Sequence, residues 1–96
     1  MGREEILKIL EETKKEIRQK YKGHIKGIFG SFVRREEKDS SDIDILVEFE
    51  EEADLFDFVG LALFLEEKLN RKVDIVPEKS LREELKGIIL DEVIHI

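Results

Sequence analysis

Apolar residues recur every three or four positions at the start of the chain. Their spacings of four, three, four and four are those of one face of an α-helix, whereas the positions between them are mostly charged. We therefore predict a helix over residues 4–21, which ends where Lys22, Gly23 and His24 interrupt the pattern. The residues on the apolar face are Ile6, Leu10, Thr13, Ile17 and Tyr21.

Two β-strands are predicted next. Residues 25–29 form a short apolar run closed by Gly30, as in a buried strand. Residues 42–49 alternate, with Ile43, Ile45 and Val47 on one face and acidic or apolar residues on the other, which is the two-residue period of a strand. Between the strands, the sequence favours a short helix over residues 31–35 and a loop over residues 38–41.

The second half of the chain predicts helix, strand and helix. Asp54 is a typical N-cap and Asp57 stands at the third helical position, so a strongly apolar helix should cover residues 55–69 and stop at Asn70. Residues 73–76 read as a strand that Pro77 ends.

The C-terminal segment predicts a last helix and an edge strand. Ser80 and Glu83 have the spacing of a capping box that would start this helix, and the helix should close at residues 88–90. Residues 93–96 are apolar enough for a short terminal edge strand.

This order of elements is an α/β pattern, and it predicts a small mixed β-sheet flanked by helices. A short connection makes the first two strands antiparallel, whereas helix 55–69 is long enough for a crossover that makes the third strand parallel to the second. At 96 residues the chain suits one domain, residues 1–96, with a single modest core.

Candidate chemistry gathers at one edge of this predicted sheet. Asp42 and Asp44 lie two apart on a strand, so both point to one face with α-carbons roughly 6.6 Å apart. Asp74 should lie beside them on the parallel strand. Such carboxylates repel one another unless a hard cation such as Mg²⁺ binds them, and two-metal phosphoryl-transfer sites are built in this way.

Phosphate-binding groups should lie at the same edge. Gly30 lets the backbone approach a phosphate closely, and Ser31 offers a hydroxyl at a helix N-terminus. Arg34 or Arg35, one turn further on, could neutralise a triphosphate or its pyrophosphate leaving group, and we favour Arg34.

Charge and composition narrow the function. Residues 1–38 carry 11 Lys/Arg against 7 Asp/Glu, a balance of +4, and residues 39–96 carry 6 against 17, a balance of −11, which together give −7. So acidic a chain lacks a broad basic face for nucleic acid, and free nucleotide with a divalent cation fits better. The absence of cysteine excludes thiolate metal sites and disulfides, and no apolar run suffices for a membrane span. We expect a cytoplasmic protein.

The segment GSFVRREEKDSSDIDILVEF, followed by KVDIV, resembles the minimal nucleotidyltransferases of the DNA polymerase beta superfamily, from about Ile25 to the end of the chain. The resemblance implies the nucleotidyltransferase fold and transfer of a nucleoside monophosphate from a nucleoside triphosphate to a hydroxyl. It further implies that Asp42, Asp44 and Asp74 hold Mg²⁺ as two ions, with Asp74 also drawing the proton from the hydroxyl. The residues matched to the family motif are Gly30, Ser31, Asp42, Asp44 and Asp74.

Members of this family that are this small resemble the antitoxin half of toxin–antitoxin pairs. The resemblance implies a HEPN-type helical ribonuclease toxin as partner and AMP transfer from ATP to a toxin tyrosine. Arg35 departs from the glycine common in relatives, which affects the loop rather than the carboxylates. Two alternatives remain open, namely an antitoxin that neutralises its toxin by binding alone and a nucleotidyltransferase that acts on a small molecule.

Overall fold

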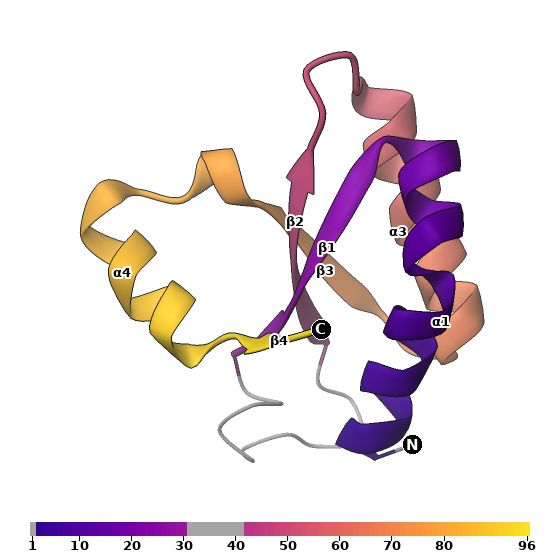
Figure 1. The fold of residues 1–96 in the computed structure, drawn as a ribbon, viewed down its shortest axis with the longest axis horizontal. Coiled ribbons are helices and arrows are strands. Elements are labelled where there is room, and N and C mark those ends of the chain that lie inside the picture. The colour runs from indigo at the N-terminus through magenta and orange to yellow at the C-terminus, as the bar shows by residue number, and fades with distance from the viewer. Residues whose placement is uncertain (1, 31–41) are drawn as a thin grey trace.

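The computed structural model describes residues 2–30 and 42–96, which build a four-stranded mixed sheet in the order β3-β2-β1-β4 with helices on both of its faces (Figure 1). The elements are α1 (Arg3–Tyr21), β1 (Gly23–Phe29), β2 (Ile43–Phe49), α3 (Leu55–Leu69), β3 (Val73–Pro77), the 3₁₀ turn η1 (Glu78–Ser80), α4 (Glu83–Glu92) and β4 (Ile94–His95). The predicted α/β architecture is confirmed.

The strand directions are those expected from the connections. β1 and β2 pair antiparallel, and β2 and β3 pair parallel across the α3 crossover. The terminal edge strand is also present, because β4 pairs antiparallel with β1 at Gly27 and Ile28. The antiparallel β1–β2 pair and the parallel β2–β3 pair thus follow from the lengths of the connections between these strands.

The main core lies between the sheet and helices α1 and α3, which run side by side on one face (Figure 1). The predicted stripe of α1 faces this core, and Thr13, its one polar member, donates its hydroxyl to the carbonyl of Ile9 at 2.8 Å. A buried hydroxyl that is satisfied within its own helix costs little. The fully buried core side chains include Ile6, Leu10, Ile17, Ile28, Ile43, Ile45, Val47, Leu61, Leu65 and Leu69.

A β-bulge in β1 allows apolar residues on both sides of the bulge to face this core. Ile25 pairs with Val47 whereas Gly27 pairs with Leu46, so Lys26 is an extra residue on the β1 side. The bulge lets Ile25 and Ile28 reach the same core despite their odd spacing. A side chain at Gly27 would collide with the carbonyl of Ile94, so glycine is what lets β4 approach β1 here.

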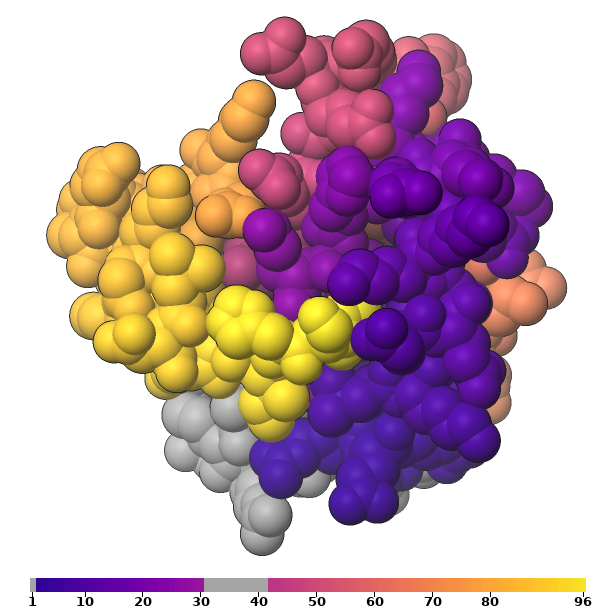
Figure 2. All heavy atoms as spheres, viewed as in Figure 1, coloured from indigo at the N-terminus to yellow at the C-terminus, as the bar shows by residue number. Residues whose placement is uncertain are grey.

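The opposite face of the sheet carries a smaller cluster covered by α4. Phe29, Leu46 and Val93 are buried there, with Ile89 and Leu90 of α4 packed against them. α4 itself has no buried residue. In the space-filling view, α4 and β4 (yellow) and α1 (indigo) form most of the visible face (Figure 2).

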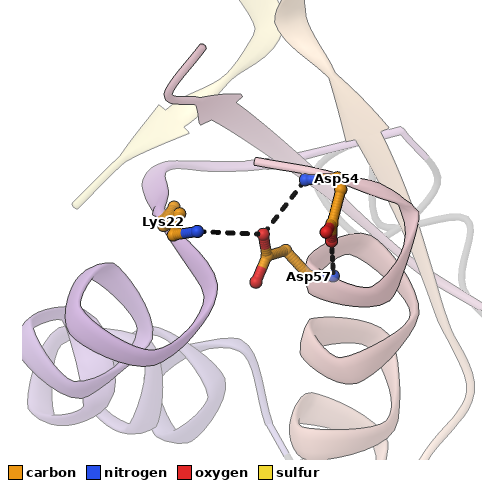
Figure 3. Close-up of polar contacts among 3 residues, drawn as sticks. All are labelled: Lys22, Asp54 and Asp57. Atoms are coloured by element: carbon orange, nitrogen blue, oxygen red, sulfur yellow. Dashed lines mark hydrogen bonds and ion pairs between the residues drawn. The ribbon is translucent and has the colours of Figure 1, made fainter. Parts of the chain in front are cut away.

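The start of α3 is fixed by the predicted aspartates. Asp54 accepts a hydrogen bond from the Asp57 backbone N–H, and the Asp57 carboxylate accepts one from the Asp54 N–H, both at 3.0 Å, which completes a capping box (Figure 3). Lys22 reaches the Asp57 carboxylate at 3.8 Å and ties this end of α3 to the end of α1. Asn70 ends the helix in the left-handed conformation, as predicted.

The capping box predicted at Ser80 is wrong. Ser80 lies in η1 and its hydroxyl donates to the carbonyl of Pro77 at 2.7 Å, whereas α4 begins at Glu83 with Arg82 as an N-cap that makes no side-chain hydrogen bond. A serine that satisfies a local carbonyl in a turn is unavailable to the helix three residues later. The last helix also extends beyond residue 90, to Glu92.

Strand limits differ slightly from the predicted ones: β1 begins at Gly23, β2 at Ile43, and β3 includes Pro77. The predicted helix over residues 31–35 lies outside the described residues. Within the described part of the chain, no helix is both long and apolar enough to cross a membrane.

Candidate functional site

Asp44 occupies the centre of the candidate site. In the sheet register it lies between Phe29 of β1 and Asp74 of β3. Neighbouring strands are about 4.8 Å apart, so the two aspartates stand side by side near the beginnings of two parallel strands. Asp44 is half-buried and Asp74 is exposed. The predicted juxtaposition of these two positions is therefore present.

Gly30 brings the turn after β1 against the Asp44 carboxylate. Its φ of 80° lies in the left-handed region that glycine adopts freely, and a Cβ at this position would overlap Oδ2 of Asp44. Glycine is thus required both by the backbone conformation and by the space that the carboxylate occupies. The glycine turn and the acidic pair, distant in sequence, meet at one sheet edge as expected.

Asp42 lies one residue before β2 and is exposed. The N–H of Ile43 donates to the carbonyl of Lys72 at 3.1 Å, which holds this entry to β2 against the segment that leads into β3. Main-chain pairing therefore positions the backbone on both sides of the acidic edge.

The donor chemistry of these positions fits Mg²⁺, since Asp42, Asp44 and Asp74 offer only hard carboxylate oxygens. In residues 2–30 and 42–96, no three aspartate, glutamate, histidine or cysteine side chains are drawn together closely enough to hold a metal ion. The backbone brings the acidic positions to one edge without gathering their side chains. The metal-binding role of the three aspartates accordingly stays a prediction.

Ser31, Arg34 and Arg35 lie outside the described residues, and their predicted contacts with phosphate stay predictions. Phe29 was not singled out from the sequence. It is buried directly beside Asp44 in the register, and its place immediately before Gly30 is the pattern that marks it. A buried aromatic residue is thus the strand neighbour of the half-buried Asp44.

A surface hollow of about 310 Å³ lies elsewhere, lined by Glu11, Lys14, Lys15 and Arg18 of α1 and by His24. His24 is at the start of β1 whereas Gly30 follows its end, so roughly 20 Å of strand separates the two. This hollow is not part of the acidic edge, and the chemistry expected of the chain does not reside in it.

A small mixed sheet with an acidic edge beside a glycine turn defines the polymerase-beta-like class of nucleotidyltransferases. The model of the nucleotidyltransferase domain family matches residues 10–96, and the chain belongs to that family. It is therefore a nucleotidyltransferase, and the resemblance noted from its motifs is confirmed.

Among its relatives is the protein adenylyltransferase MntA of Thermococcus cleftensis, 43% identical over 93 residues that cover 97% of this chain and 94% of the relative. A solved structure described as a minimal nucleotidyltransferase superposes with a TM-score of 0.81 at 36% identity, covering 96% of this chain and 94% of the other. A toxin–antitoxin structure with AMP-PNP gives a TM-score of 0.60 at 27% identity, covering 88% of this chain and 64% of that one.

Proposed function

We propose that this chain is a Mg²⁺-dependent protein adenylyltransferase and an antitoxin. It transfers AMP from ATP to a hydroxyl, specifically that of a tyrosine, on a HEPN-type helical ribonuclease toxin and thereby blocks the toxin. The observation that carries the proposal is the pairing of Asp44 with Asp74 beside the Gly30 turn. Residues 1–96 act as one nucleotidyltransferase domain in the cytoplasm, without binding nucleic acid or membrane.

The residues at the acidic edge divide the work of the reaction. Asp42, Asp44 and Asp74 would hold a pair of Mg²⁺ ions. When bound, these ions would neutralise the negative charge of the triphosphate. Gly30 and Ser31 would receive the triphosphate through backbone N–H groups and a hydroxyl, and Arg34 would neutralise charge on the pyrophosphate leaving group.

The transfer itself exchanges the phosphoanhydride bond between the α- and β-phosphates of ATP for a phosphodiester bond to the acceptor. The acceptor hydroxyl oxygen attacks the α-phosphorus of ATP, its proton passes to the Asp74 carboxylate, and the bond to the bridging oxygen of pyrophosphate breaks. The products are the AMP ester of the acceptor and pyrophosphate. Asp74 suits this role because it is exposed and can reach a hydroxyl presented from outside.

The names of relatives support a protein acceptor and a toxin partner. A relative that shares 43% of its residues over nearly its whole length is named a protein adenylyltransferase. A structural neighbour is a toxin–antitoxin complex crystallised with AMP-PNP, an analogue of ATP.

The proposal is tested with the purified chain, the product of the neighbouring gene, ATP labelled in its α-phosphate, and Mg²⁺. Wild type should transfer label to the partner, and Asp42→Asn should not, because the amide is a poor ligand for a hard cation. Ser80→Ala is a control, since Ser80 is an exposed hydroxyl in η1, which follows the end of β3 opposite to Asp74. Equal labelling by wild type and Asp42→Asn would overturn the proposal.

Neutralisation by binding alone is distinguished by a second experiment, the suppression of toxicity in cells. In that case Asp42→Asn and Asp44→Asn would still suppress toxicity in cells, whereas the enzymatic mechanism requires suppression to be lost while association is kept. Transfer to a small molecule would appear as label in a low-mass product made by the isolated chain.

A further inference from the structure

The outward face of α3 is apolar, although it meets solvent. Four large side chains on it are exposed, at 73% for Leu55, 87% for Phe56, 45% for Val59 and 60% for Leu63. Residues three and four apart on a helix are neighbours, so these four side chains form one continuous surface, here called the α3 stripe. A surface helix of a globular protein normally carries polar residues on this face.

Packing on the inner side of α3 excludes a role for the α3 stripe in the core of this chain. Leu61, Leu65 and Leu69 are fully buried against the sheet and fix the rotation of the helix. Gly60 fixes its approach to α1, since a Cβ there would stand 2.8 Å from the Tyr21 ring. The helix cannot turn to bury Phe56 without exposing that leucine row.

Acidic residues surround the α3 stripe. Between residues 50 and 69 there are seven carboxylates and one lysine, a balance of −6. Glu51 and Glu52 are exposed just before α3, and Glu67 is exposed one turn beyond Leu63. In Figure 2 the segment that follows β2 projects from the top of the molecule. A contiguous apolar patch with a charged rim is typical of a protein–protein interface.

We propose that the α3 stripe is the docking surface for the toxin partner, which presents an amphipathic helix with an apolar stripe flanked by lysine and arginine. The inference rests on the proposed function for the identity of the partner. Charge selects this occupant over a second copy of the chain, because two copies would bring their acidic rims together and each chain already carries −7. A helix laid along α3 matches the geometry of helix-in-groove recognition.

The α3 stripe is separate from the acidic edge, but the C-terminal end of α3 leads toward that edge. α3 covers the face of the sheet opposite to the smaller cluster that contains Phe29, the register neighbour of Asp44. The C-terminus of α3 leads through residues 70–72 to β3, of which Asp74 is the second residue. A partner held along α3 therefore has one end near the acidic edge, where its acceptor hydroxyl must lie.

The test substitutes acid into the stripe and measures affinity for the purified neighbouring gene product by isothermal titration calorimetry. Phe56→Glu and Leu63→Glu should each raise Kd by at least about thirtyfold, because a central apolar anchor is lost and the acidic rim is extended. Ile88→Glu is the matched control: Ile88 is 59% exposed on α4, nearly the same as Leu63, and its Kd should stay within about threefold of wild type. Thermal unfolding verifies that all variants fold.

Labelling with ATP separates this inference from the proposed function. If wild type binds the partner but adenylylates nothing, the enzymatic function fails while the calorimetric comparison still decides the docking surface. If Phe56→Glu and Leu63→Glu bind as wild type does, the docking inference is overturned. It is also overturned if wild type does not bind the gene product, or if sedimentation shows that wild type alone is a dimer and Phe56→Glu a monomer.

Discussion

The two faces of the sheet are built in different ways. Toward α1 and α3, apolar side chains from three strands and two helices are fully buried in one continuous core. Toward α4, the buried residues in the described part of the chain are Phe29, Leu46 and Val93, and α4 contributes none of them. Asp44 lies on this second face, and its strand neighbour Asp74 is exposed. Stability therefore resides mainly on one face and the candidate chemistry on the other.

Because the main core lies on the other face of the sheet, the acidic edge can hold neighbouring carboxylates that a closely packed core could not. Carboxylates placed side by side repel one another, and the cost is borne by the packing beneath them on the opposite face. The middle strand β2 links the two faces, since Ile43 and Ile45 hold it in the core while Asp44 points the other way. Substitutions on the two faces should consequently affect different properties.

The largest expected effect separates chemistry from stability at Asp44. Asp44→Asn should lower AMP transfer by about a hundred- to a thousandfold, because under the proposed function it removes one of the negative charges that would hold Mg²⁺. The midpoint of urea unfolding should move far less than in the core variant described next. A large fall in stability with activity per folded molecule preserved would break the division between the faces.

The reverse effect is expected at Leu65, which is fully buried beneath the opposite face. Leu65→Ala should lower the free energy of unfolding by about 2–5 kcal/mol, through lost transfer energy and a residual cavity. Transfer activity per folded molecule, measured well below the unfolding midpoint, should stay near wild type. Urea denaturation followed by circular dichroism measures the change.

Gly30 contributes to both the stability of the fold and the geometry of the acidic edge, so Gly30→Ala should lower both stability and transfer activity. The left-handed φ of 80° costs alanine about 1–2 kcal/mol, and the new methyl group would push aside the Asp44 carboxylate. We expect at least about a tenfold loss of transfer together with this modest destabilisation. Gly87→Ala is the control, because a Cβ at Gly87 meets open space within helix α4. Full activity in Gly30→Ala would contradict the close approach.

A smaller effect is expected where α4 covers the second face. Ile89 is only half-buried against the small cluster, so Ile89→Ala should cost about 1 kcal/mol. The comparison with Leu65→Ala sharpens the contrast between the faces, since both replace a branched aliphatic side chain with alanine. Equal losses in the two variants would show that α4 is as firmly packed as α3.

The smallest effect on stability is expected for the exposed ion pair between Glu16 and Lys20 on α1. Lys20 donates to Glu16 at 2.6 Å, and this hydrogen bond lowers the pKa of Glu16 below 4.5 and raises the pKa of Lys20 above 10.5. Any stabilisation is thus present at neutral pH and is lost as the pH falls through the lowered pKa of Glu16. Because both groups are exposed, thermal unfolding of Lys20→Ala should match wild type at pH 7.

The elements themselves could be predicted because each rests on local chemistry. The period of α1, the Asp54 and Asp57 capping box and the stop at Asn70 depend on residues within one turn of one another. Connection lengths were enough to fix strand directions. The failure at Ser80 has the same local character, since two local partners competed for one hydroxyl and the nearer carbonyl prevailed.

The sequence by itself determined the class of this protein: a periodic pattern predicts helices and strands, and a Gly-Ser pair followed by spaced aspartates resembles the motif of the nucleotidyltransferases. The sequence also placed Asp74 and Gly30 at the same edge as Asp44, whereas only the tertiary structure decided that Asp44 pairs in register with Asp74 rather than with another residue of β3, that Gly30 leaves no room for a Cβ beside the Asp44 carboxylate, and that one apolar face of α3 remains exposed. Pairing register and the rotation of a helix on a sheet depend on how distant residues pack together. No local pattern encodes them, because the burial of Leu61, Leu65 and Leu69 is what turns Phe56 outward.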